Sequence, residues 1–445
     1  MRRSPLDAWI ASLVAADSAG DPSAAFDRAA LERYQLRQLR KTLRLARTHS
    51  AFYRRHLAGA PEELRSLEDL QSLPLTTADD IRANPLGLVC VSQDEINRVV
   101  TLDSSGTTGS PKRVYFTRAD QALTVDFFEA GMSVFTAAGD RVLILLPVER
   151  PGSVGDLLAT AMENLGAIPI RYGPVRDPAE ALRVAADEGA TVAVGVPTHL
   201  LRMARHGLEP LPLPRLHSVL LSTDHVPAAI VNAIETAWPC RVYNHYGTTE
   251  MGLGGGVDCE ARRGYHLREA DLLFEVVDPA NGRPVMDGER GEVVFTTLTR
   301  TGMPVIRYRT GDLGHWLPDP CPCGSELRTL SHITTRVAGQ FALGPGATLT
   351  QVDLDEAVFA VDGVLDFAAR VTRPGAAAEL QIRVQVAPLR PLPAAHDDIA
   401  LALHAIPAIV RAASSGDLDS IDVIVATDRV SEPTLAKRSI AVDAQ

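Results

Sequence analysis

The chain has 445 residues with a formal net charge of −11, and 46% of its residues are hydrophobic. This length exceeds what one hydrophobic core usually supports, so two or three domains are expected, and the acidic balance argues against a nucleic-acid partner. No segment reaches the roughly 18 to 20 apolar residues that cross a bilayer, and the five cysteines are unevenly spread, so we expect a cytoplasmic, disulfide-free protein that acts on small molecules.

The first clear pattern along the chain is helical. Residues 27–58 place Leu, Tyr and Phe at helical spacing with arginines between them, which predicts one amphipathic helix with a solvated basic face. From residue 141 apolar strands alternate with amphipathic helices, the pattern of βαβ units in a parallel sheet covered on both faces. The predicted strands are 141–147, 167–173, 191–197, 216–223 and 240–247, and the predicted helices are 155–166, 178–189, 198–207 and 227–238.

The pattern changes after residue 250, where short strands indicate an antiparallel or barrel-like subdomain, at 272–277 and 291–297. Beyond residue 336 the sequence predicts a small α+β domain, with strands at 366–373, 379–386 and 422–427 and helices at 349–361 and 397–414. A Gly/Pro-rich tract at 339–349 predicts a hinge near residue 337. We therefore expect an α/β protein with a large domain over 1–336, combining mainly parallel sheets flanked by helices with a strand-rich subdomain, and a small mobile domain over 337–445.

The segment SSGTTGSPK is the strongest chemical signal, because it combines hydroxyls, glycines and a lysine where strand-like sequence ends. Glycines allow the backbone to approach a ligand, hydroxyls donate hydrogen bonds, and Lys112 adds a compact positive charge. The chain has only three lysines, Lys41, Lys112 and Lys437, among 44 basic residues, so one kept in this loop favours phosphate binding, and hence ATP, over a flexible linker. It is not a Walker loop, since G-K-[ST] is absent. The other phosphate-binding candidates are Ser104, Ser105, Gly106, Thr107, Thr108 and Gly109.

Two later segments support a nucleotide site. Residues 243–252, YNHYGTTEMG, close the last alternating strand, and α/β proteins place ligands at such strand ends. Glu250 there offers a hard oxygen ligand for Mg²⁺, and Tyr246 an aromatic face for a purine, although a helix N-cap with an acidic first turn is the alternative. In residues 303–314, MPVIRYRTGDLG, Asp312 lies in a predicted Gly-Asp turn, from which a carboxylate can accept both ribose hydroxyls.

Together, SSGTTGSPK, YGTTE and RYRTGD resemble the adenylate-forming superfamily of acyl-coenzyme A synthetases, luciferases and peptide-synthetase adenylation domains. Residues 35–58, the stretch VGVPTHLLRMAR at 194–205, PVIRYRTGD and CPCG are most similar to its phenylacetate-coenzyme A ligase branch. The resemblance covers roughly residues 30 to 330 well and the remainder weakly.

The resemblance implies a two-step reaction. A carboxylate attacks the α-phosphate of ATP to give an acyl adenylate and pyrophosphate, and the thiol of coenzyme A then displaces AMP. Catalysis would rest on positioning and charge neutralisation and use no protein nucleophile. The resemblance assigns Lys112 to the phosphates, Glu250 to Mg²⁺, Thr249 to the α-phosphate, Asp312 to the ribose, and Asn244, His245, Tyr246, Gly247 and Thr248 to the nucleotide, with Arg336 at the hinge.

Four further side chains form a possible zinc set, in two clusters within the strand-rich region: Cys259, His266, Cys321 and Cys323. Three thiols and one imidazole are the ligands of a tetrahedral structural zinc site. The C-x-C spacing is tighter than that of the usual zinc knuckle. We favour zinc over the alternative of three unrelated buried thiols and a surface histidine.

The C-terminal part departs from the superfamily pattern. The superfamily carries a lysine near the C-terminus that contacts the reacting carboxylate and the α-phosphate. In this chain an ungapped alignment places Leu435 there, and a slip of two residues restores Lys437 as the catalytic residue. The acidic hinge segment of the superfamily is replaced by residues 336–340, which leaves open the domain rotation and coenzyme A as acceptor.

The substrates are less defined than the chemistry. The acid-pocket candidates are residues 147–158, 222–225 and 252–256. The polar residues Glu149, Arg150, Asp224 and His225 would suit a polar or amino-substituted aryl acid, with solvent-facing loop residues as the alternative. An ATP-dependent ligase joining an aryl or arylacetic acid to coenzyme A is the first hypothesis. The alternatives are adenylation with an amine or carrier thiol as acceptor, nitrite activation for diazotisation of an aryl amine, and a non-catalytic nucleotide-binding protein. The expected partners are a small acid and a nucleotide, with no nucleic acid or membrane, and a homodimer is left open.

Overall fold

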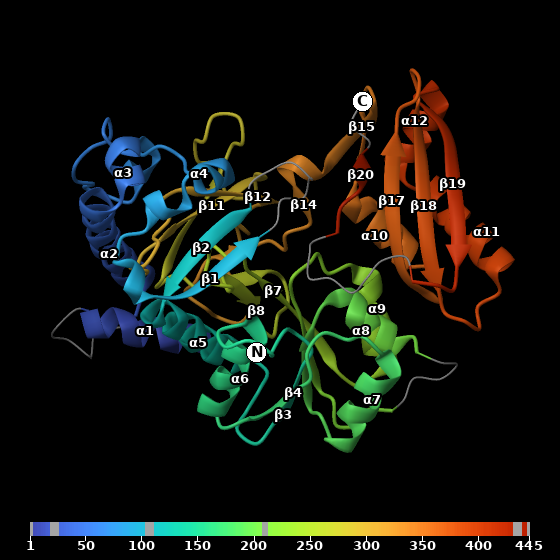
Figure 1. Cartoon of the computed structure of the whole chain (residues 1–445), viewed down its shortest axis with the longest axis horizontal. Helices are drawn as coiled ribbons and strands as arrows, with labels where there is room; N and C mark the ends of the chain where they lie inside the picture. Colours follow the sequence, from blue (N-terminus) through green and yellow to red (C-terminus); the bar gives the residue numbers. More distant parts are fainter. Residues whose placement is uncertain (1–2, 18–25, 103–110, 207–211, 430–437, 443–445) are drawn as a thin grey trace. The chain divides into compact units, whose positions relative to one another are not determined.

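The computed structural model describes residues 3–17, 26–102, 111–206, 212–429 and 438–442 (Figure 1). The chain forms two compact units. Unit 1 comprises Met1–Ala138, Arg150–Gly166 and Asn244–Ile333, and unit 2 comprises Gly139–Glu149, Ala167–Tyr243 and Thr334–Gln445. The predicted α/β fold class is confirmed. The division into domains over 1–336 and 337–445 stays a prediction.

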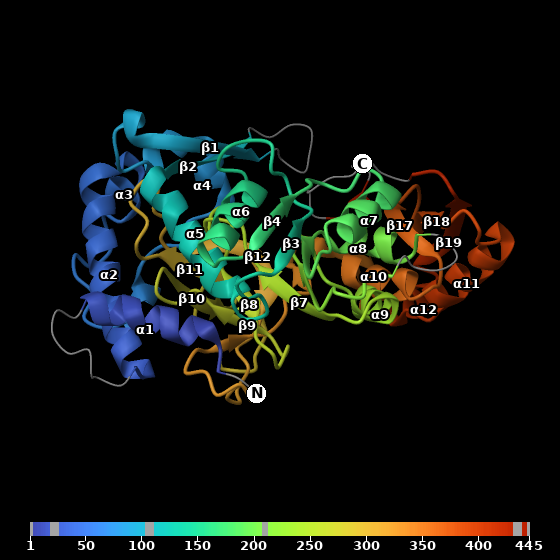
Figure 2. The ribbon, with the colours of Figure 1, turned by 90° about the horizontal axis from the view of Figure 1, so that it is seen from below.

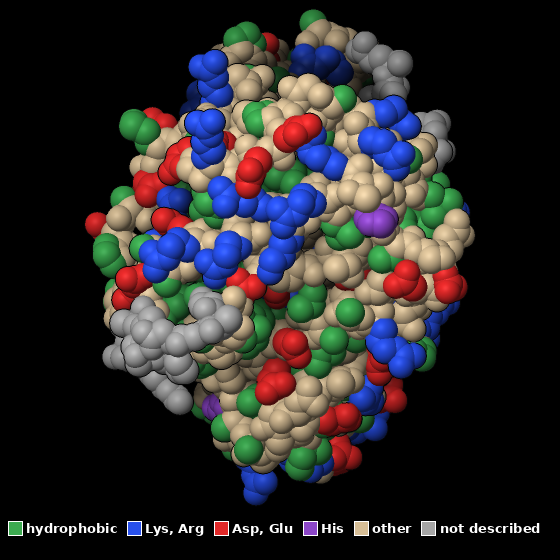
Figure 3. Space-filling model, turned by 90° about the vertical axis from the view of Figure 1, so that its left-hand side faces the viewer, with side chains coloured by type: hydrophobic (Ala, Val, Ile, Leu, Met, Phe, Trp, Pro, Cys, Tyr) green, Lys and Arg blue, Asp and Glu red, His purple; other side chains and the backbone are tan. Residues whose placement is uncertain are grey.

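Unit 1 begins with α1 (Pro5–Asp17). The one helix predicted over 27–58 is divided in the structure into α2 (Arg28–His49) and α3 (Ala51–His56). The break falls at Ser50, whose extended backbone (φ −89°, ψ 120°) ends α2 and whose hydroxyl accepts a hydrogen bond from the backbone N–H of Tyr53. A serine that caps the next helix offers the backbone an alternative to helix continuation, which explains the wrong prediction. Basic side chains gather on the face that bears α2 and α3 (Figure 3).

The phosphate-loop segment lies between two strands of a hairpin, β1 (Ile96–Leu102) and β2 (Lys112–Thr117), which pair antiparallel. Helices α5 (Arg118–Met132) and α6 (Val154–Asn164) follow and lie side by side in both ribbon views (Figures 1 and 2). Thr117 and Asp120 form a capping box at the start of α5. Shorter helices are η1 (Glu68–Ser72), α4 (Ala78–Ala83), η2 (Pro85–Leu88) and η3 (Gln93–Glu95).

The strand-rich part of unit 1 contains two antiparallel groups of strands, and the strands predicted at 272–277 and 291–297 are both in the first group. Strands β10 (Leu272–Val277), β11 (Gly291–Thr297) and β12 (Tyr308–Gly314) pair in that order, and every residue of β11 is buried. Valine, phenylalanine and threonine suit a strand that is covered on both faces. The end of β7 (Arg241–Tyr246) pairs with β8 (Gly256–Asp258), which pairs with β9 (Tyr265–Leu267) and then β13 (Thr329–Leu330).

Unit 2 contains the predicted parallel sheet. Strands β4 (Ile168–Arg171), β3 (Arg141–Ile144), β5 (Val192–Gly195) and β6 (Ser218–Leu221) are parallel neighbours in that order. The central strands β5 and β6 are buried throughout, which is why their sequences read as apolar runs. The helices of this part are α7 (Pro178–Asp187), α8 (Pro197–Ala204) and α9 (Ala228–Ala237).

The C-terminal part of unit 2 is the predicted α+β arrangement. Its sheet has the order β19-β18-β17-β20, with a separate hairpin of β15 and β16. The bounds are β14 (Thr335–Arg336), η4 (Val337–Gly339), β15 (Gln340–Gly344), β16 (Ala347–Thr350), α10 (Gln351–Phe359), β17 (Val364–Thr372), β18 (Ala378–Val386), α11 (Leu392–His404), α12 (Pro407–Ser415), β19 (Leu418–Ala426) and β20 (Ala441–Val442).

The single helix predicted over 397–414 is wrong, because the structure divides it into α11 and α12, which meet at 79°. Pro407 is the first residue of α12, and proline cannot donate the backbone hydrogen bond that would continue the preceding helix. Within the described residues, no single helix is long and apolar enough to cross a membrane, although this bent pair passes that test by length and composition.

Candidate active site

Most of the predicted phosphate loop lies outside the described residues, namely Ser104, Ser105, Gly106, Thr107, Thr108 and Gly109. The strands on either side of it are described. Leu102 at the end of β1 pairs with Lys112 at the start of β2. The hairpin therefore fixes both ends of the segment and places Lys112 at its exit.

Lys112, Glu250 and Tyr308 meet in unit 1, although they come from three distant parts of the sequence. The ammonium of Lys112 forms an ion pair with the Glu250 carboxylate and donates to the Tyr308 hydroxyl at 3.2 Å. The Tyr308 hydroxyl in turn donates to Glu250 Oε1 at 2.8 Å. The Glu250 side chain is 4% exposed and that of Lys112 is 15% exposed, so the lysine is the solvent-facing member of the pair.

The electrostatics of Glu250 follow from these contacts. Burial by itself raises the pKa of the carboxyl, but the Lys112 charge and the hydrogen bonds from Lys112, the Glu250 backbone and Tyr308 outweigh it and lower the pKa overall. The carboxylate is therefore ionised at neutral pH. A buried anion beside a partly exposed cation is an arrangement that can receive a divalent metal on one side and phosphate oxygens on the other.

Tyr246 and Asp312 also meet, and here one expectation was wrong. Asp312 lies within strand β12 and not in a turn, and its side chain is fully buried. The pairing of β12 with β11 is irregular between Arg309 and Leu313, and Gly311 within this bulge has φ +74°, a conformation that glycine adopts without strain. The Tyr246 hydroxyl donates to Asp312 Oδ2 at 3.1 Å, and the Tyr246 ring stacks on Tyr265 with centroids 5.5 Å apart.

The segment between β7 and β8 is a tight turn, and the alternative of a helix N-cap does not apply. The Thr248 carbonyl accepts hydrogen bonds from the backbone N–H groups of Met251 and Leu253. A Cβ atom at Gly247 would lie 2.4 Å from the Leu253 carbonyl oxygen, so only glycine fits there. Thr249 is half-buried in the same turn, next to Glu250.

Asn244 and His245 precede this turn on β7. The backbone N–H of Asn244 donates to the carboxylate of Asp258 at 2.8 Å. The His245 ring lies 6.3 Å from the rings of both Phe127 and Phe128 in α5, and burial lowers its pKa to about 4. The imidazole is therefore neutral at physiological pH.

The other predicted residues are spread over the chain. Arg336 is exposed on β14 in unit 2, and both Leu435 and Lys437 lie outside the described residues. Glu149 and Arg150 are exposed, whereas Asp224 lies in unit 2 against Arg438, whose backbone N–H donates to it at 3.2 Å.

The loop after β6 holds Asp224 and His225. Asp224 also accepts the backbone N–H of His225 at 2.9 Å, and burial raises the pKa of its carboxyl. His225 Nε2 lies 3.6 Å from a carboxylate oxygen of Glu356. Thr223 in this loop has φ +80°, an unusual conformation for a β-branched residue.

The four predicted zinc ligands lie together in unit 1. One ligand atom from each residue falls within 4.8 Å of the others, and all four residues are buried: Cys259, His266, Cys321 and Cys323. The sulfurs of Cys259 and Cys321 are 3.5 Å apart, and His266 Nε2 is 3.2 Å from the sulfur of Cys323. Burial alone would raise the pKa of Cys321, but hydrogen bonds from His266 and the other thiols lower it to about 6. A buried set of three sulfurs and one nitrogen is the donor set of tetrahedral zinc.

Two residues that contact Glu250, Tyr308 and Arg300, are not among the predicted site residues. Tyr308 lies inside the motif RYRTGD but was given no role there. Arg300 donates from Nη1 to the main-chain carbonyl of Glu250 at 2.7 Å. The signal for Tyr308 was its place in the motif, whereas nothing local in the sequence marks Arg300.

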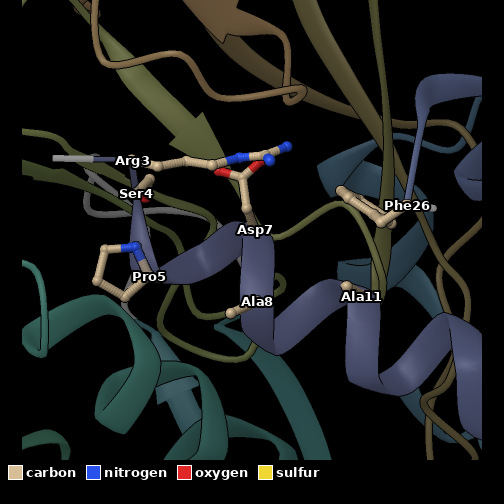
Figure 4. Close-up of a pocket in the computed structure, with 7 residues that line it drawn as sticks. All are labelled: Arg3, Ser4, Pro5, Asp7, Ala8, Ala11 and Phe26. Atoms are coloured by element: carbon tan, nitrogen blue, oxygen red, sulfur yellow. The ribbon is translucent and has the colours of Figure 1, made fainter. Parts of the chain in front are cut away.

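A surface pocket of about 370 Å³ lies at the start of α1 (Figure 4). Arg3, Asp7 and Phe26 are among the residues that line it, and Arg3 forms an ion pair with Asp7 at 3.3 Å. None of the predicted site residues lines this pocket.

The sequence of this chain is similar to those of known enzymes. Residues 32–299 match the family described as AMP-binding enzyme. The chain is 31% identical over 354 residues to a phenylacetate-coenzyme A ligase of Thermus thermophilus, covering 75% of this chain and 77% of the relative.

Among solved structures, it is similar to 2-hydroxyisobutyryl-CoA ligase in complex with 2-HIB-AMP, with a TM-score of 0.77, 23% identity and coverage of 95% and 94%. It is also similar to an amide bond synthetase of Marinactinospora thermotolerans, with a TM-score of 0.55, 16% identity and coverage of 98% of each chain. At these identities the two structures bear on the fold alone.

Proposed function

This chain belongs to the AMP-binding enzyme family and is an AMP-forming ligase, and from that premise we propose that it adenylates a small aryl or arylacetic acid and transfers the acyl group to coenzyme A. The observation that carries the proposal is the meeting of Lys112 and Glu250 at the exit of the phosphate-loop segment. The Thermus relative supports an arylacetic acid and coenzyme A as the substrates.

The first half-reaction needs charge neutralisation around the triphosphate and an aligned carboxylate. Lys112 supplies the cation, and its partly exposed ammonium can move from Glu250 to phosphate oxygens. The loop residues 104–109 would add hydroxyl and backbone donors, and Thr249 would donate to the α-phosphate. The residues position the reactants, and the acid itself is the nucleophile.

The metal role of Glu250 fits the donor chemistry. Its carboxylate is a hard oxygen ligand, ionised because Lys112 outweighs the effect of burial. Bound Mg²⁺ would neutralise charge that accumulates on the phosphates. Tyr308 donates to the same carboxylate at 2.8 Å, so it would hold the Glu250 carboxylate in place when Lys112 contacts phosphate.

Tyr246 and Asp312 would form the nucleoside end of the site. Asp312 would accept the ribose hydroxyls, and the Tyr246 hydroxyl, 3.1 Å from Oδ2, holds its carboxylate in place. Asn244, His245, Gly247 and Thr248 would border the adenine, and Arg336, in unit 2, stays a predicted nucleotide contact. The neutral imidazole of His245 suits an uncharged base or aryl ring.

The acceptor is the less constrained part of the proposal. Lys437 would serve as the C-terminal catalytic lysine. Transfer to an amine or a carrier thiol, or activation of nitrite for diazotisation of an aryl amine, stays as the second candidate, because Leu435 occupies the ungapped lysine position.

We also propose a structural zinc ion. The thiolates of Cys259, Cys321 and Cys323 with the imidazole of His266 would hold it as a closed four-ligand site, with no position left for a substrate. It would tie the turn after β8 and strand β9 to the loop before β13.

The test is pyrophosphate release with a panel of aryl and arylacetic acids, run alone and with coenzyme A, amines or nitrite, with products identified by mass. We expect acid-dependent pyrophosphate and a thioester. The Lys112→Met variant should lose pyrophosphate release, whereas the Lys41→Met variant, which removes a lysine whose side chain is 55% exposed, should retain it. Formation of the acyl adenylate without a thioester would refute coenzyme A as the acceptor and favour the second candidate. A full panel without pyrophosphate would refute both.

A further inference from the structure

The turn that carries Glu250 is held through its main chain as well as through the Glu250 side chain. The Glu250 carboxylate contacts Lys112. The main-chain carbonyl of Glu250 accepts a hydrogen bond from Nη1 of Arg300 at 2.7 Å, and that of Gly252 accepts one from the Thr124 hydroxyl at 2.9 Å. Two other elements, helix α5 and the segment after β11, thus hold the main chain at the predicted metal ligand and two residues after it.

Arg300 is itself tightly placed. It is 6% exposed, and its guanidinium lies 4.9 Å from the centre of the Phe116 ring. Burial lowers its pKa to about 10, so it is still charged at neutral pH. The absence of a side chain at Gly252 makes room for it, because a Cβ atom there would lie 2.7 Å from Nη2 of Arg300.

A buried guanidinium is a costly donor for a single carbonyl oxygen. Removing a charged group from water is unfavourable unless several partners compensate, and Arg268 nearby adds a like charge. Asp120, Glu250 and Asp271 provide the compensating negative charge. The buried guanidinium therefore lies at the turn that carries Thr249 and Glu250, the predicted α-phosphate and metal contacts.

We infer that Arg300 is a positioning residue that sets the orientation of the Glu250 carboxylate for a divalent metal, with Thr124 acting in the same way at Gly252. This inference rests on the proposed function. Groups that orient a metal ligand without touching the metal typically change metal affinity or activity by about 10- to 100-fold when altered. Sequence patterns cannot reveal such a role, because the hydrogen bond ends on the main chain.

The test measures ATP binding by calorimetry on the full chain, with Mg²⁺ and with a chelator. We expect Mg²⁺ to tighten ATP binding to the wild type, and Arg300→Lys to reduce this tightening about tenfold while the affinity without Mg²⁺ stays the same. The matched control is Arg47→Lys, a half-buried arginine of the same unit whose Nη2 donates to the main-chain carbonyls of Ala60 and Pro61. It should keep the full Mg²⁺ effect.

A second variant keeps the inference testable if Arg300→Lys fails to fold. Thr124→Val removes the other donor without altering charge, and should reduce the Mg²⁺ effect in the same direction by a smaller factor. A folded Arg300→Lys with the wild-type Mg²⁺ effect would overturn the inference, as would an unchanged Thr124→Val where Arg300→Lys does not fold. A wild-type chain that binds no ATP would overturn the proposed function itself, and this inference with it.

Discussion

Replacing Lys112 by methionine should destabilise the protein more than replacing Glu250 by glutamine, although both changes remove the same ion pair. The Glu250 side chain is 4% exposed and the Lys112 side chain 15%, so the anion is the deeper partner. Lys112→Met leaves a buried carboxylate with the hydrogen bond from Tyr308 but without its cation. Glu250→Gln leaves an ammonium that already reaches water.

The magnitude follows from the cost of an unpaired buried charge. Removing one partner of a buried pair typically costs about 3 to 5 kcal/mol, and the hydrogen bond that Glu250 keeps favours the lower end, about 3 kcal/mol. For Glu250→Gln we expect about 1 kcal/mol, because the remaining charge is partly solvated. In a domain of this size 1 kcal/mol shifts Tm by roughly 2 to 4 °C, so the two variants should differ by several degrees.

The pH dependence has a definite sign. In the wild type the pKa of Glu250 is lowered from its ordinary value of 4.5, so its ionisation contributes stability above pH 4.5 that is lost as the pH falls through the lowered pKa. In Lys112→Met, burial dominates and the pKa should rise above 4.5. The variant should therefore be most destabilised at neutral pH, and its Tm should approach that of the wild type toward pH 4.

Calorimetric unfolding of the wild type, both single variants and the double variant tests this reasoning. The double variant Lys112→Met/Glu250→Gln should be more stable than Lys112→Met alone, since it buries no unpaired charge. Lys41→Met is the control and should leave Tm almost unchanged, because that lysine is exposed. A Lys112→Met variant as stable as Glu250→Gln would refute the reasoning. So would a Tm difference between the wild type and Lys112→Met that grows as the pH is lowered.

Three further outcomes are expected. The purified protein should contain one zinc ion per chain by elemental analysis. The Cys259→Ser variant should lose the zinc and roughly 2 kcal/mol or more of its free energy of unfolding. A wild-type protein that is fully stable without zinc would contradict this prediction. Gly247→Ala should lower both Tm and ATP affinity in a binding assay, because its Cβ would lie 2.4 Å from the Leu253 carbonyl oxygen. Asp312→Asn should raise the KM for ATP about tenfold with little change in Tm, since the amide can still accept from Tyr246, and an unchanged KM would exclude Asp312 from the ribose site.

The parallel sheet and its helices could be predicted because their signal is local. Strands β5 and β6 are buried throughout, so their sequences are continuous apolar runs between amphipathic helices. The two wrong helix predictions came from single residues. At Ser50 and Pro407 the apolar spacing continues, but the side chain or the missing N–H changes what the backbone can do.

The candidate site was predicted from short motifs. Lys112, Glu250 and Asp312 lie in motifs whose residue types suit phosphate, metal and ribose, and these roles stay predictions. Asp312 was placed in a turn because Gly-Asp is a common turn pair, and only the pairing of β12 with β11 on either side shows that it lies in a bulge within a strand. Arg300 could not be found, because a hydrogen bond to a main-chain carbonyl requires no particular residue at the acceptor position.

The sequence by itself determined which kinds of element form and which chemical groups the chain possesses, including the three motifs and the four zinc-ligand candidates. Periodicity, turn chemistry and residue type are properties of neighbouring positions, so they can be interpreted without coordinates. Only the tertiary structure decided that Glu250 is the buried member of its pair, that Tyr308 bridges it to Lys112, and that the four ligands meet within 4.8 Å. Burial and pairing depend on side chains far apart in the sequence, and packing alone brings these together.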